Sequence, residues 1–258
     1  MKAIILSAGQ GKRLRPHTDD TPKCLLPIRG DEPVLEVQLR ALAACGVEEA
    51  LVFVGFGAEK VEDFVARRAP SGIRVRTEFN PFYAVADNLA TCWLARDHMH
   101  DDFLILNGDT LFEPAALRRL LSAPRAPLTL AVNQKPSYDE DDMKVCLASG
   151  GRLVGVGKTL DARIVDAESI GLMLFRRKGA DHFRSVIERA VRREDATRLW
   201  YLSIVNEMAQ ETEVATVAIN GLWWGELDSP EDLASLRADL NDDAKGEARV
   251  DRPLFAQG

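Results

Sequence analysis

Apolar and polar positions follow two different periods in the first half of the chain. Short runs rich in apolar or β-branched residues predict strands at 2–6, 50–54, 73–78, 103–106 and 128–133. Between them, helical spacing and helix-start signals predict helices over 33–45, 58–67, 87–98 and 114–121. Strands that alternate with helices in this way predict a parallel sheet with right-handed crossovers.

The second half of the chain has a different pattern. Shorter strands with glycine turns are expected at 143–148, 151–156 and 170–175, which favours an antiparallel or mixed extension beside the parallel core. Helices over 180–192 and 200–210, strands over 214–219 and 223–227, and a last helix from Pro230 to about Asp239 complete the expected order. From Asn241 onward the residues are polar and small, which is typical of a frayed tail.

Overall composition narrows the class of protein. The 258 residues carry a net charge of −7 with a pI near 5.3, which disfavours nucleic acid as a partner. Four cysteines are scattered without a C-x-x-C spacing, so free thiols in a reducing cytoplasm are expected rather than a zinc site or a redox pair. No apolar run is long enough for a signal peptide or a membrane span, so no membrane partner is expected. Both a monomer and a homodimer are compatible with this pattern.

A glycine loop follows the first strand at once. In Ala8-Gly9-Gln10-Gly11 the backbone N–H groups can turn toward a phosphate, and Lys12, Arg13 and Arg15 add positive charge. We expect the loop to lead into a helix N-terminus, which would favour an anion further. Lys23 can approach from the far side of the loop. Two separated basic points around one turn suit a triphosphate better than a single phosphate.

Two other interpretations fit a glycine loop taken alone. One is an ordinary strand–turn–helix corner with solvated charges. The other is a dinucleotide site, whose G-x-G-x-x-G fingerprint requires a third glycine where this chain has Leu14. The P-loop pattern G-x-x-x-x-G-K-[ST] is also absent.

A longer segment is more specific than the loop. Residues 6–28, LSAGQGKRLRPHTDDTPKCLLPI, resemble the signature of nucleotidyltransferases that activate sugar phosphates, phosphocholine and related alcohol phosphates, with Ser7 and Cys24 as departures. The resemblance implies a Rossmann-like α/β fold of the nucleotide-diphospho-sugar transferase type, with three α/β/α layers, a mixed and mainly parallel sheet, and a small β-rich acceptor-binding extension. It implies a nucleotide-binding half at 1–135 and an acceptor-binding half at 136–240 within one domain, 1–240, before the tail at 241–258. The nucleotide-binding residues it implies are Leu6, Ala8, Gly9, Gly11, Lys12, Arg13, Lys23, Asn88 and Gly108.

Two aspartates at predicted strand ends are candidate metal ligands. Asp109 follows the strand 103–106, and Asp228 lies in Glu226-Leu227-Asp228-Ser229-Pro230, where Ser229 can cap the last helix and leave Asp228 free. Isolated turn aspartates would be the alternative. ILNGDTLF and WWGELDSPEDLA are similar to the two metal-binding segments of the family, which implies Mg²⁺ held by Asp109 and Asp228. The implied catalytic residues are these two aspartates with Arg13 at the β- and γ-phosphates and Lys23 at the α-phosphate.

The acceptor half points to one branch of the family. NPFYAVADNLATCW, DEDDMKV and AESIG resemble the branch of phosphocholine cytidylyltransferases and their phosphonate and inositol-phosphate relatives, and this branch implies CTP as the donor. Lys158 is similar to the family's lysine for the acceptor phosphate, with a solvated turn lysine as the alternative. Acidic and aromatic groups suit an ammonium or a hydroxyl-rich acceptor, although core positions would explain the aromatic residues equally well. The candidates are Glu168, Tyr201, Trp224 and Glu226.

Three functional hypotheses follow. The first is a Mg²⁺-dependent nucleotidyltransferase, most simply one that joins CMP to a small phosphorylated or phosphonate acceptor, with a sugar-1-phosphate enzyme that makes an NDP-sugar as its alternative. The second is a catalytically silent, nucleotide-sensing subunit, which would be expected to lack Arg13, Lys23 or an aspartate ligand; all are present. The third, a dinucleotide-dependent oxidoreductase, fails on the missing glycine.

Overall fold

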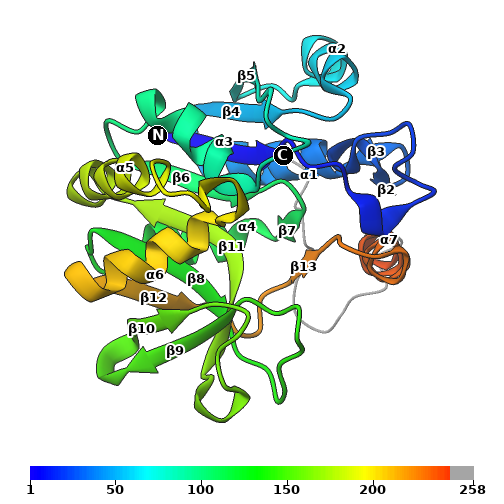
Figure 1. Ribbon diagram of the computed structural model, residues 1–258. Coiled ribbons are helices and arrows are strands. Elements are labelled where there is room, and N and C mark those ends of the chain that lie inside the picture. Colours follow the sequence, from blue (N-terminus) through cyan, green and yellow to red (C-terminus); the bar gives the residue numbers. More distant parts are fainter. Residues whose placement is uncertain (245–258) are drawn as a thin grey trace.

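A nine-stranded mixed sheet forms the centre of the molecule (Figure 1). The computed structural model describes the backbone of residues 1–244 and the side chains of residues 1–241. Strands β5, β4, β1 and β6 run parallel, whereas β11 is antiparallel to both β6 and β8. The order across the sheet is β5 (Arg74–Phe79), β4 (Glu49–Val54), β1 (Lys2–Ser7), β6 (Phe103–Asn107), β11 (Ala167–Phe175), β8 (Leu128–Asn133), β12 (Val214–Ala218), β10 (Arg152–Val156) and β9 (Lys144–Ala148).

Helices cover both faces of this sheet because its strands alternate their buried side chains. Ile4 of β1 packs in the core beneath α3 (Asn88–Leu94), α5 (Arg177–Ala190) and α6 (Tyr201–Glu211). Its neighbours Ala3 and Ile5 face the opposite core with α1 (Val34–Ala43), α2 (Ala58–Arg68) and α4 (Pro114–Leu121). The expected three-layer α/β/α arrangement is therefore confirmed.

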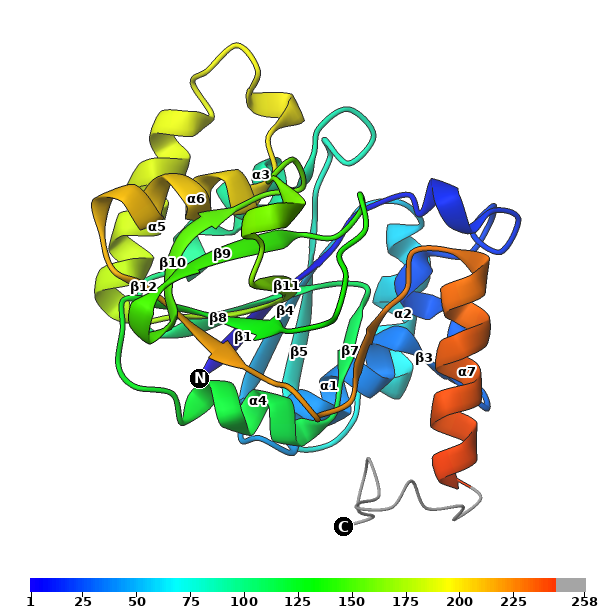
Figure 2. The same cartoon turned by 90° about the horizontal axis from the view of Figure 1, so that it is seen from below.

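A third, smaller core lies at the side of the sheet. It joins α7 (Pro230–Ala244) to the hairpin of β2 (Pro27–Arg29) and β3 (Glu32–Pro33) through residues such as Ile28, Trp223 and Leu236. Beside it, β13 (Trp224–Glu226) pairs antiparallel with β7 (Thr110–Phe112), with Glu226 opposite Thr110 (Figure 2). This pairing brings the segment before Asp228 next to the segment after Asp109.

Single turns of 3₁₀ helix supply the remaining regular structure. The first two, η1 (Lys12–Leu14) and η2 (Lys23–Leu25), lie in the opening motif. The others are η3 (Ala95–His98), η4 (Ser149–Gly151), η5 (Ala162–Ile164) and η6 (Ala196–Arg198).

Several boundaries differ from the sequence-based expectations. The glycine loop leads into the three-residue turn η1 and not into an α-helix, because the backbone is already extended at Arg15, the residue after this turn. The last helix continues to Ala244 instead of ending near Asp239, so the first residues of the expected tail are helical, and the rest of that tail lies outside the described residues. Among the described residues, no helix combines the length and the hydropathy needed to cross a bilayer.

Candidate functional site

A cavity of about 640 Å³ opens at the carboxyl ends of β1 and β6. In open α/β sheets, ligands bind at the carboxyl ends of the parallel strands. Both halves of the chain contribute to its walls. The residues that line it include Leu6, Ser7, Ala8, Gly9, Gly11, Lys12, Arg13, Lys23, Asn80, Tyr83, Asn88, Asn107, Gly108, Asp109, Asp141, Lys158, Arg198, Trp200, Glu226 and Asp228.

The glycine loop forms one wall of the cavity. Gly11 has a φ of 60°, a left-handed conformation that suits glycine, and its carbonyl accepts a hydrogen bond of 2.7 Å from the Thr18 hydroxyl. A Cβ built on Gly9 meets no atom within 4 Å, so the backbone there is open to a ligand. The loop can thus present backbone N–H groups, but a three-residue 3₁₀ turn adds no helix dipole.

Gly108 lets β6 approach the end of β1. Its N–H donates a hydrogen bond of 3.1 Å to the carbonyl of Leu6, and a Cβ at this position would lie 2.3 Å from the Ser7 hydroxyl oxygen. The next residue, Asp109, accepts a backbone hydrogen bond of 3.0 Å from Leu227. The glycine therefore fixes Asp109 between the first strand and the β13 segment.

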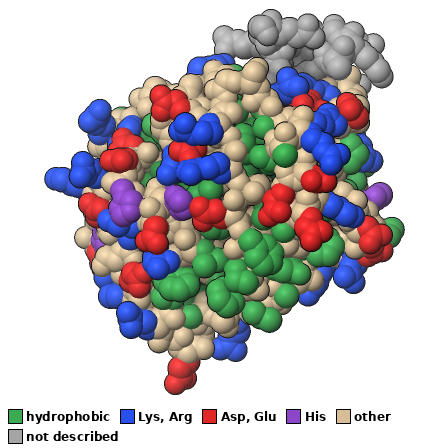
Figure 3. Space-filling model, turned by 90° about the horizontal axis from the view of Figure 1, so that it is seen from above, with side chains coloured by type: hydrophobic (Ala, Val, Ile, Leu, Met, Phe, Trp, Pro, Cys, Tyr) green, Lys and Arg blue, Asp and Glu red, His purple; other side chains and the backbone are tan. Residues whose placement is uncertain are grey.

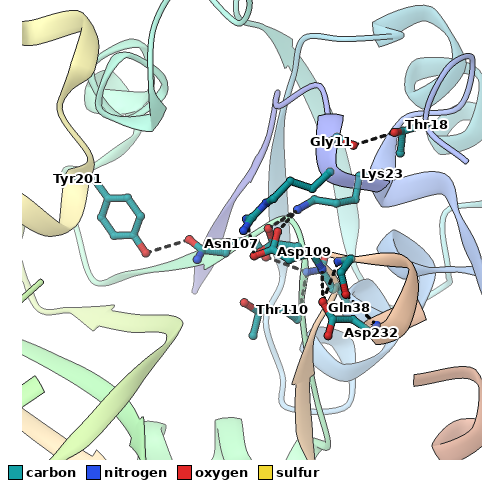
Figure 4. A network of polar contacts seen from close by, with 12 residues as sticks. Gly11, Thr18, Lys23, Gln38, Asn107, Asp109, Thr110, Tyr201 and Asp232 are labelled. Atoms are coloured by element: carbon teal, nitrogen blue, oxygen red, sulfur yellow. Dashed lines mark hydrogen bonds and ion pairs between the residues drawn. The ribbon is translucent and has the colours of Figure 1, made fainter. Parts of the chain in front are cut away.

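Three carboxylates meet at this point. One oxygen from each of Asp109, Glu226 and Asp228 lies within 4.8 Å of the others. The Lys23 ammonium lies between two of them, with Nζ 2.6 Å from Asp109 Oδ2 and 3.0 Å from Asp228 Oδ1 (Figure 4). Arg13 adds a second cation, 2.8 Å from Asp228 Oδ2. The site is a compact network of alternating charges.

The charges shift the ionisation of the groups in this network. Burial alone would lower the pKa of Lys23, but the attraction of Asp109 and Asp228 outweighs it and raises that pKa. Burial opposes ionisation of Asp228, yet Lys23 and Arg13 hold the pKa of this carboxyl below its usual range. Burial and the nearby Asp109 and Asp228 raise the pKa of Glu226 to about 8. Asp228 is therefore ionised at neutral pH, and Lys23 is positively charged.

The start of α7 positions Asp228. The Asp232 carboxylate accepts hydrogen bonds from the backbone N–H groups of Asp228 and Ser229, at 3.0 and 2.8 Å. In return, the Ser229 hydroxyl accepts one of 3.1 Å from the Asp232 backbone. This reciprocal capping satisfies the helix start, and it leaves the Asp228 side chain available for the cavity, as the sequence predicted.

The carboxylate cluster fits a hard divalent cation. Asp109 Oδ1 is buried and has no hydrogen-bond partner among the described residues. Such an atom is costly unless a ligand satisfies it. Carboxylate oxygens are the ligands that Mg²⁺ prefers, usually one or two together with substrate phosphates and water. Asp109 and Asp228 meet this description, and Glu226 lies beside them.

Part of the cavity wall comes from the second half of the chain. Lys158 Nζ lies 4.6 Å from the centre of the Trp200 ring and 3.6 Å from an oxygen of Asp141. The other oxygen of Asp141 lies 3.6 Å from Arg13. Asp141 therefore bridges Lys158 and a cation of the glycine loop at the cavity.

Most of the predicted site residues meet in this cavity, but three do not. Glu168 is buried against Lys135, 2.9 Å away, and Asn133. Tyr201 is fully buried and faces the core, where Val205 and Met208 lie on the same helix face. Trp224 packs against the core beneath α1 and α4. Their positions give no support for direct contact with an acceptor, because Tyr201 belongs to the core, Trp224 packs partly buried against it and Glu168 is paired with Lys135.

Sequence reasoning missed several lining residues. Trp200 lies one position before Tyr201, and the spacing 201–205–208 was a signal that Tyr201 faces the core and its neighbour does not. Asn107 and Asp141 lie within the family-like segments ILNGDTLF and DEDDMKV but were not among the candidates, and Arg198 lies in neither segment.

The loop after β5 forms another wall of the cavity, which the sequence did not indicate. Tyr83 lines the cavity, while Phe79, Phe82 and Val85 of the same segment are exposed. The view from the β5 side shows a group of hydrophobic side chains ringed by charged ones (Figure 3). No pattern in the sequence indicates that the apolar residues of this loop border the site.

Comparison with known proteins places this geometry in a family. Residues 3–193, more than half of the chain, match the MobA-like NTP transferase domain. The chain is 26% identical to the choline-phosphate cytidylyltransferase of Streptococcus pneumoniae over 94% of its own length and 100% of the relative's. It is 25% identical to the 2-aminoethylphosphonate cytidylyltransferase of Lancefieldella rimae over 90% of each.

Two further comparisons extend this picture. The chain is 37% identical to the CMP-5'-(3-aminopropyl)phosphonate synthase of Streptomyces rubellomurinus, although the match covers 51% of this chain and only 20% of that longer protein. The solved inositol-1-phosphate CTP transferase from T. maritima shares the fold, with a TM-score of 0.73 and 22% identity over 92% of this chain and 94% of that one. The chain therefore belongs to the family of MobA-like NTP transferase domains, and it is a nucleotidyltransferase.

Proposed function

We propose that this nucleotidyltransferase joins the CMP part of CTP to a small phosphorylated or phosphonate acceptor and releases pyrophosphate. The observation that carries the proposal is the position of Asp109 and Asp228 in one cavity that the glycine loop and Lys158 also line. Relatives over most of the chain's length use choline phosphate and 2-aminoethylphosphonate, as their names say, and this supports CTP and an acceptor of that kind.

The reaction needs positioning and charge neutralisation rather than a covalent intermediate. An oxygen of the acceptor phosphate attacks the α-phosphorus of CTP, a new P–O bond forms, and the bond to the β-phosphate oxygen breaks. The acceptor phosphate carries negative charge at neutral pH, so no general base is required. Holding both anionic reactants in line is the main task of the protein.

Each charged residue has a role in this scheme. Arg13 binds the β- and γ-phosphates, and the backbone of Gly9 and Gly11 lines the triphosphate. Lys23 binds the α-phosphate after leaving its two carboxylates. Lys158, which also lines the cavity, binds the acceptor phosphate.

A divalent cation completes the charge balance. We propose Mg²⁺, held by Asp109 and Asp228, because two carboxylates with one orphaned oxygen match its ligand preference. When bound, Mg²⁺ neutralises phosphate oxygens as negative charge shifts toward pyrophosphate. The four free cysteines support a reducing compartment, so we place the reaction in the cytoplasm.

A panel of substrate pairs tests the proposal. CTP, UTP, GTP, dTTP and ATP are each combined with phosphocholine, 2-aminoethylphosphonate, inositol 1-phosphate and a hexose 1-phosphate, with Mg²⁺ or with EDTA, and pyrophosphate release is measured. We expect release with CTP and one of the first three acceptors, and none with EDTA. Pyrophosphate release with a hexose 1-phosphate alone would show that the acceptor is a sugar phosphate and that the enzyme makes an NDP-sugar. No release with any pair would refute the proposal.

A further inference from the structure

We infer that Tyr201 is a positioning residue, which orients the amide groups of Asn107 and Asn88 so that their NH₂ groups face the cavity as hydrogen-bond donors. The inference rests on the proposed function, since it assigns these donors to oxygen atoms of the substrates. It gives a role in the site to a residue whose side chain never reaches the cavity.

The first contact is at the end of β6. The Tyr201 side chain is fully buried, and its hydroxyl donates a hydrogen bond of 2.9 Å to Asn107 Oδ1 (Figure 4). Asn107 lines the cavity directly before Gly108 and Asp109. Because the amide oxygen is held by the tyrosine, the amide nitrogen is left on the other side. No protein acceptor for this nitrogen is found among residues 1–241.

The second contact is made by the backbone of the same residue. The Tyr201 N–H donates a hydrogen bond of 2.9 Å to Asn88 Oδ1, and Asn88 also lines the cavity. A backbone N–H can only donate, so this bond identifies the amide oxygen of Asn88 without ambiguity. One tyrosine at the start of α6 therefore fixes two asparagines, one on α3 and one on β6.

The sheet makes room for the Asn107 amide. Gly171 lies in β11 with a φ of 73°, where the pairing of β11 with β8 shifts register between Ser169 and Met173. A Cβ on Gly171 would lie 2.3 Å from Asn107 Nδ2. The irregularity in β11 thus leaves space that a regular strand with a side chain would fill. Below the amide, the Asn107 carbonyl is held by Gln38 Nε2 at 2.9 Å.

Oriented in this way, Asn107 suits a phosphate oxygen near the reacting phosphorus. It adjoins Asp109, and its NH₂ is a neutral donor that can follow the charge developing on that oxygen during transfer. An amide turned the other way would present its own oxygen to an anion. In the structure the Tyr201 hydroxyl donates to the amide oxygen, which leaves the amide nitrogen as the group that can donate to a ligand.

A double-mutant cycle tests the link between the two side chains. Tyr201→Phe, Asn107→Ala and the double variant are assayed with CTP and the acceptor that gives the highest turnover. We expect Tyr201→Phe to lower kcat about tenfold with the KM for CTP changed less than twofold, and Asn107→Ala to lower kcat at least as much. The double variant should be no slower than Asn107→Ala alone. Multiplicative losses would overturn the inference.

Two controls separate positioning from stability. Thr129→Val removes another buried hydroxyl, one without a partner among the described residues, and should leave kcat unchanged. Circular dichroism melting of every variant identifies any loss that reflects unfolding. If Tyr201→Phe loses activity only in proportion to its unfolded fraction, the tyrosine has a structural role alone.

A readout independent of turnover distinguishes this inference from the proposed function. The side-chain amide signal of Asn107 is identified in the ¹H–¹⁵N NMR spectrum by its absence in Asn107→Ala. It should shift in Tyr201→Phe and, in the wild type, on addition of CTP with Mg²⁺. Absence of either shift would refute the inference even if transfer occurs, whereas shifts without transfer would refute the proposed function alone.

Discussion

The ammonium group of Lys23 lies 2.6 Å from Asp109, in the position between two carboxylates where a divalent cation would also bind. Under the proposed function, a cation held by Asp109 and Asp228 would have to compete with Lys23 for the same negative charge. Lys23 would then neutralise the carboxylates before substrates arrive and bind the α-phosphate afterwards.

Replacing this lysine should separate its two roles. We expect Lys23→Met to bind Mg²⁺ at least tenfold more tightly in the absence of nucleotide, because Asp109 and Asp228 lose the ammonium group between them, and to lower kcat at least a hundredfold. Calorimetric titration with Mg²⁺ and the pyrophosphate assay measure the two effects. Lys178→Met, an exposed lysine on α5 outside the cavity, is the control and should change neither. Unchanged Mg²⁺ affinity in Lys23→Met would argue against competition.

The metal-ligand assignment predicts a ranking among the three acids. Asp109→Asn and Asp228→Asn should each abolish measurable Mg²⁺ binding and lower kcat about a thousandfold or more. Glu226→Gln should have a smaller effect, since burial and the other two carboxyls already disfavour its ionisation. Glu62→Gln on the exposed side of α2 serves as the control. A larger loss in Glu226→Gln than in Asp109→Asn would reverse the assignment.

Gly108 should be intolerant of any side chain. A Cβ there would lie 2.3 Å from the Ser7 hydroxyl oxygen and 2.7 Å from the Leu6 carbonyl oxygen, so Gly108→Ala must push β6 away from β1. We expect a loss of about 2 to 3 kcal/mol in the free energy of unfolding, measured with urea. Ser7→Ala should rescue only part of this loss, because the backbone contact remains. Gly157→Ala, where a Cβ meets nothing within 4 Å, should stay within about 0.5 kcal/mol of wild type.

Replacing Lys144 should weaken binding of the acceptor and leave binding of CTP nearly unchanged. Its buried ammonium donates to the backbone carbonyls of Asp139 and Lys158, the latter at 3.0 Å, and so ties together two loops of the second half. We expect Lys144→Met to raise the KM for the acceptor about tenfold while the KM for CTP changes less than twofold, because Lys158 loses its fixed position. Arg152→Met, an exposed residue of β10, is the matched control. Equal increases in both KM values would contradict this division of the cavity.

Much of the fold could be predicted because the relevant signals are local. The strands at 2–6, 50–54 and 103–106 and the helices between them follow from hydrophobic spacing, and the carboxyl ends of these strands fix where Asp109 lies. Asp228 could be paired with it because both residues follow strands. The Ser229 cap was also visible in the sequence, and the structure confirms it.

The features of the site that could not be predicted depend on contacts between segments that are distant in the sequence. The ion pair of Glu168 with Lys135 joins a strand residue to a residue of the loop after β8, and no sequence spacing indicates it. Whether Tyr201 or Trp200 faces the cavity depends on how α6 is rotated about its axis. The apolar face of this helix could have answered the question, because Tyr201, Val205 and Met208 share it and face the core. The glycine loop was expected to open an α-helix, but the chain turns away after one 3₁₀ turn.

Transfer of isotope from CTP tests the central claim most directly. CTP labelled with ³²P at the α-phosphate or at the γ-phosphate is incubated with Mg²⁺, enzyme and the preferred acceptor, and the products are separated. Nucleotidyl transfer predicts that the α-label enters the acceptor conjugate and the γ-label leaves as pyrophosphate, and that both signals are lost in Asp228→Asn. A γ-label on the acceptor, or an α-label found only in free CMP, would contradict it.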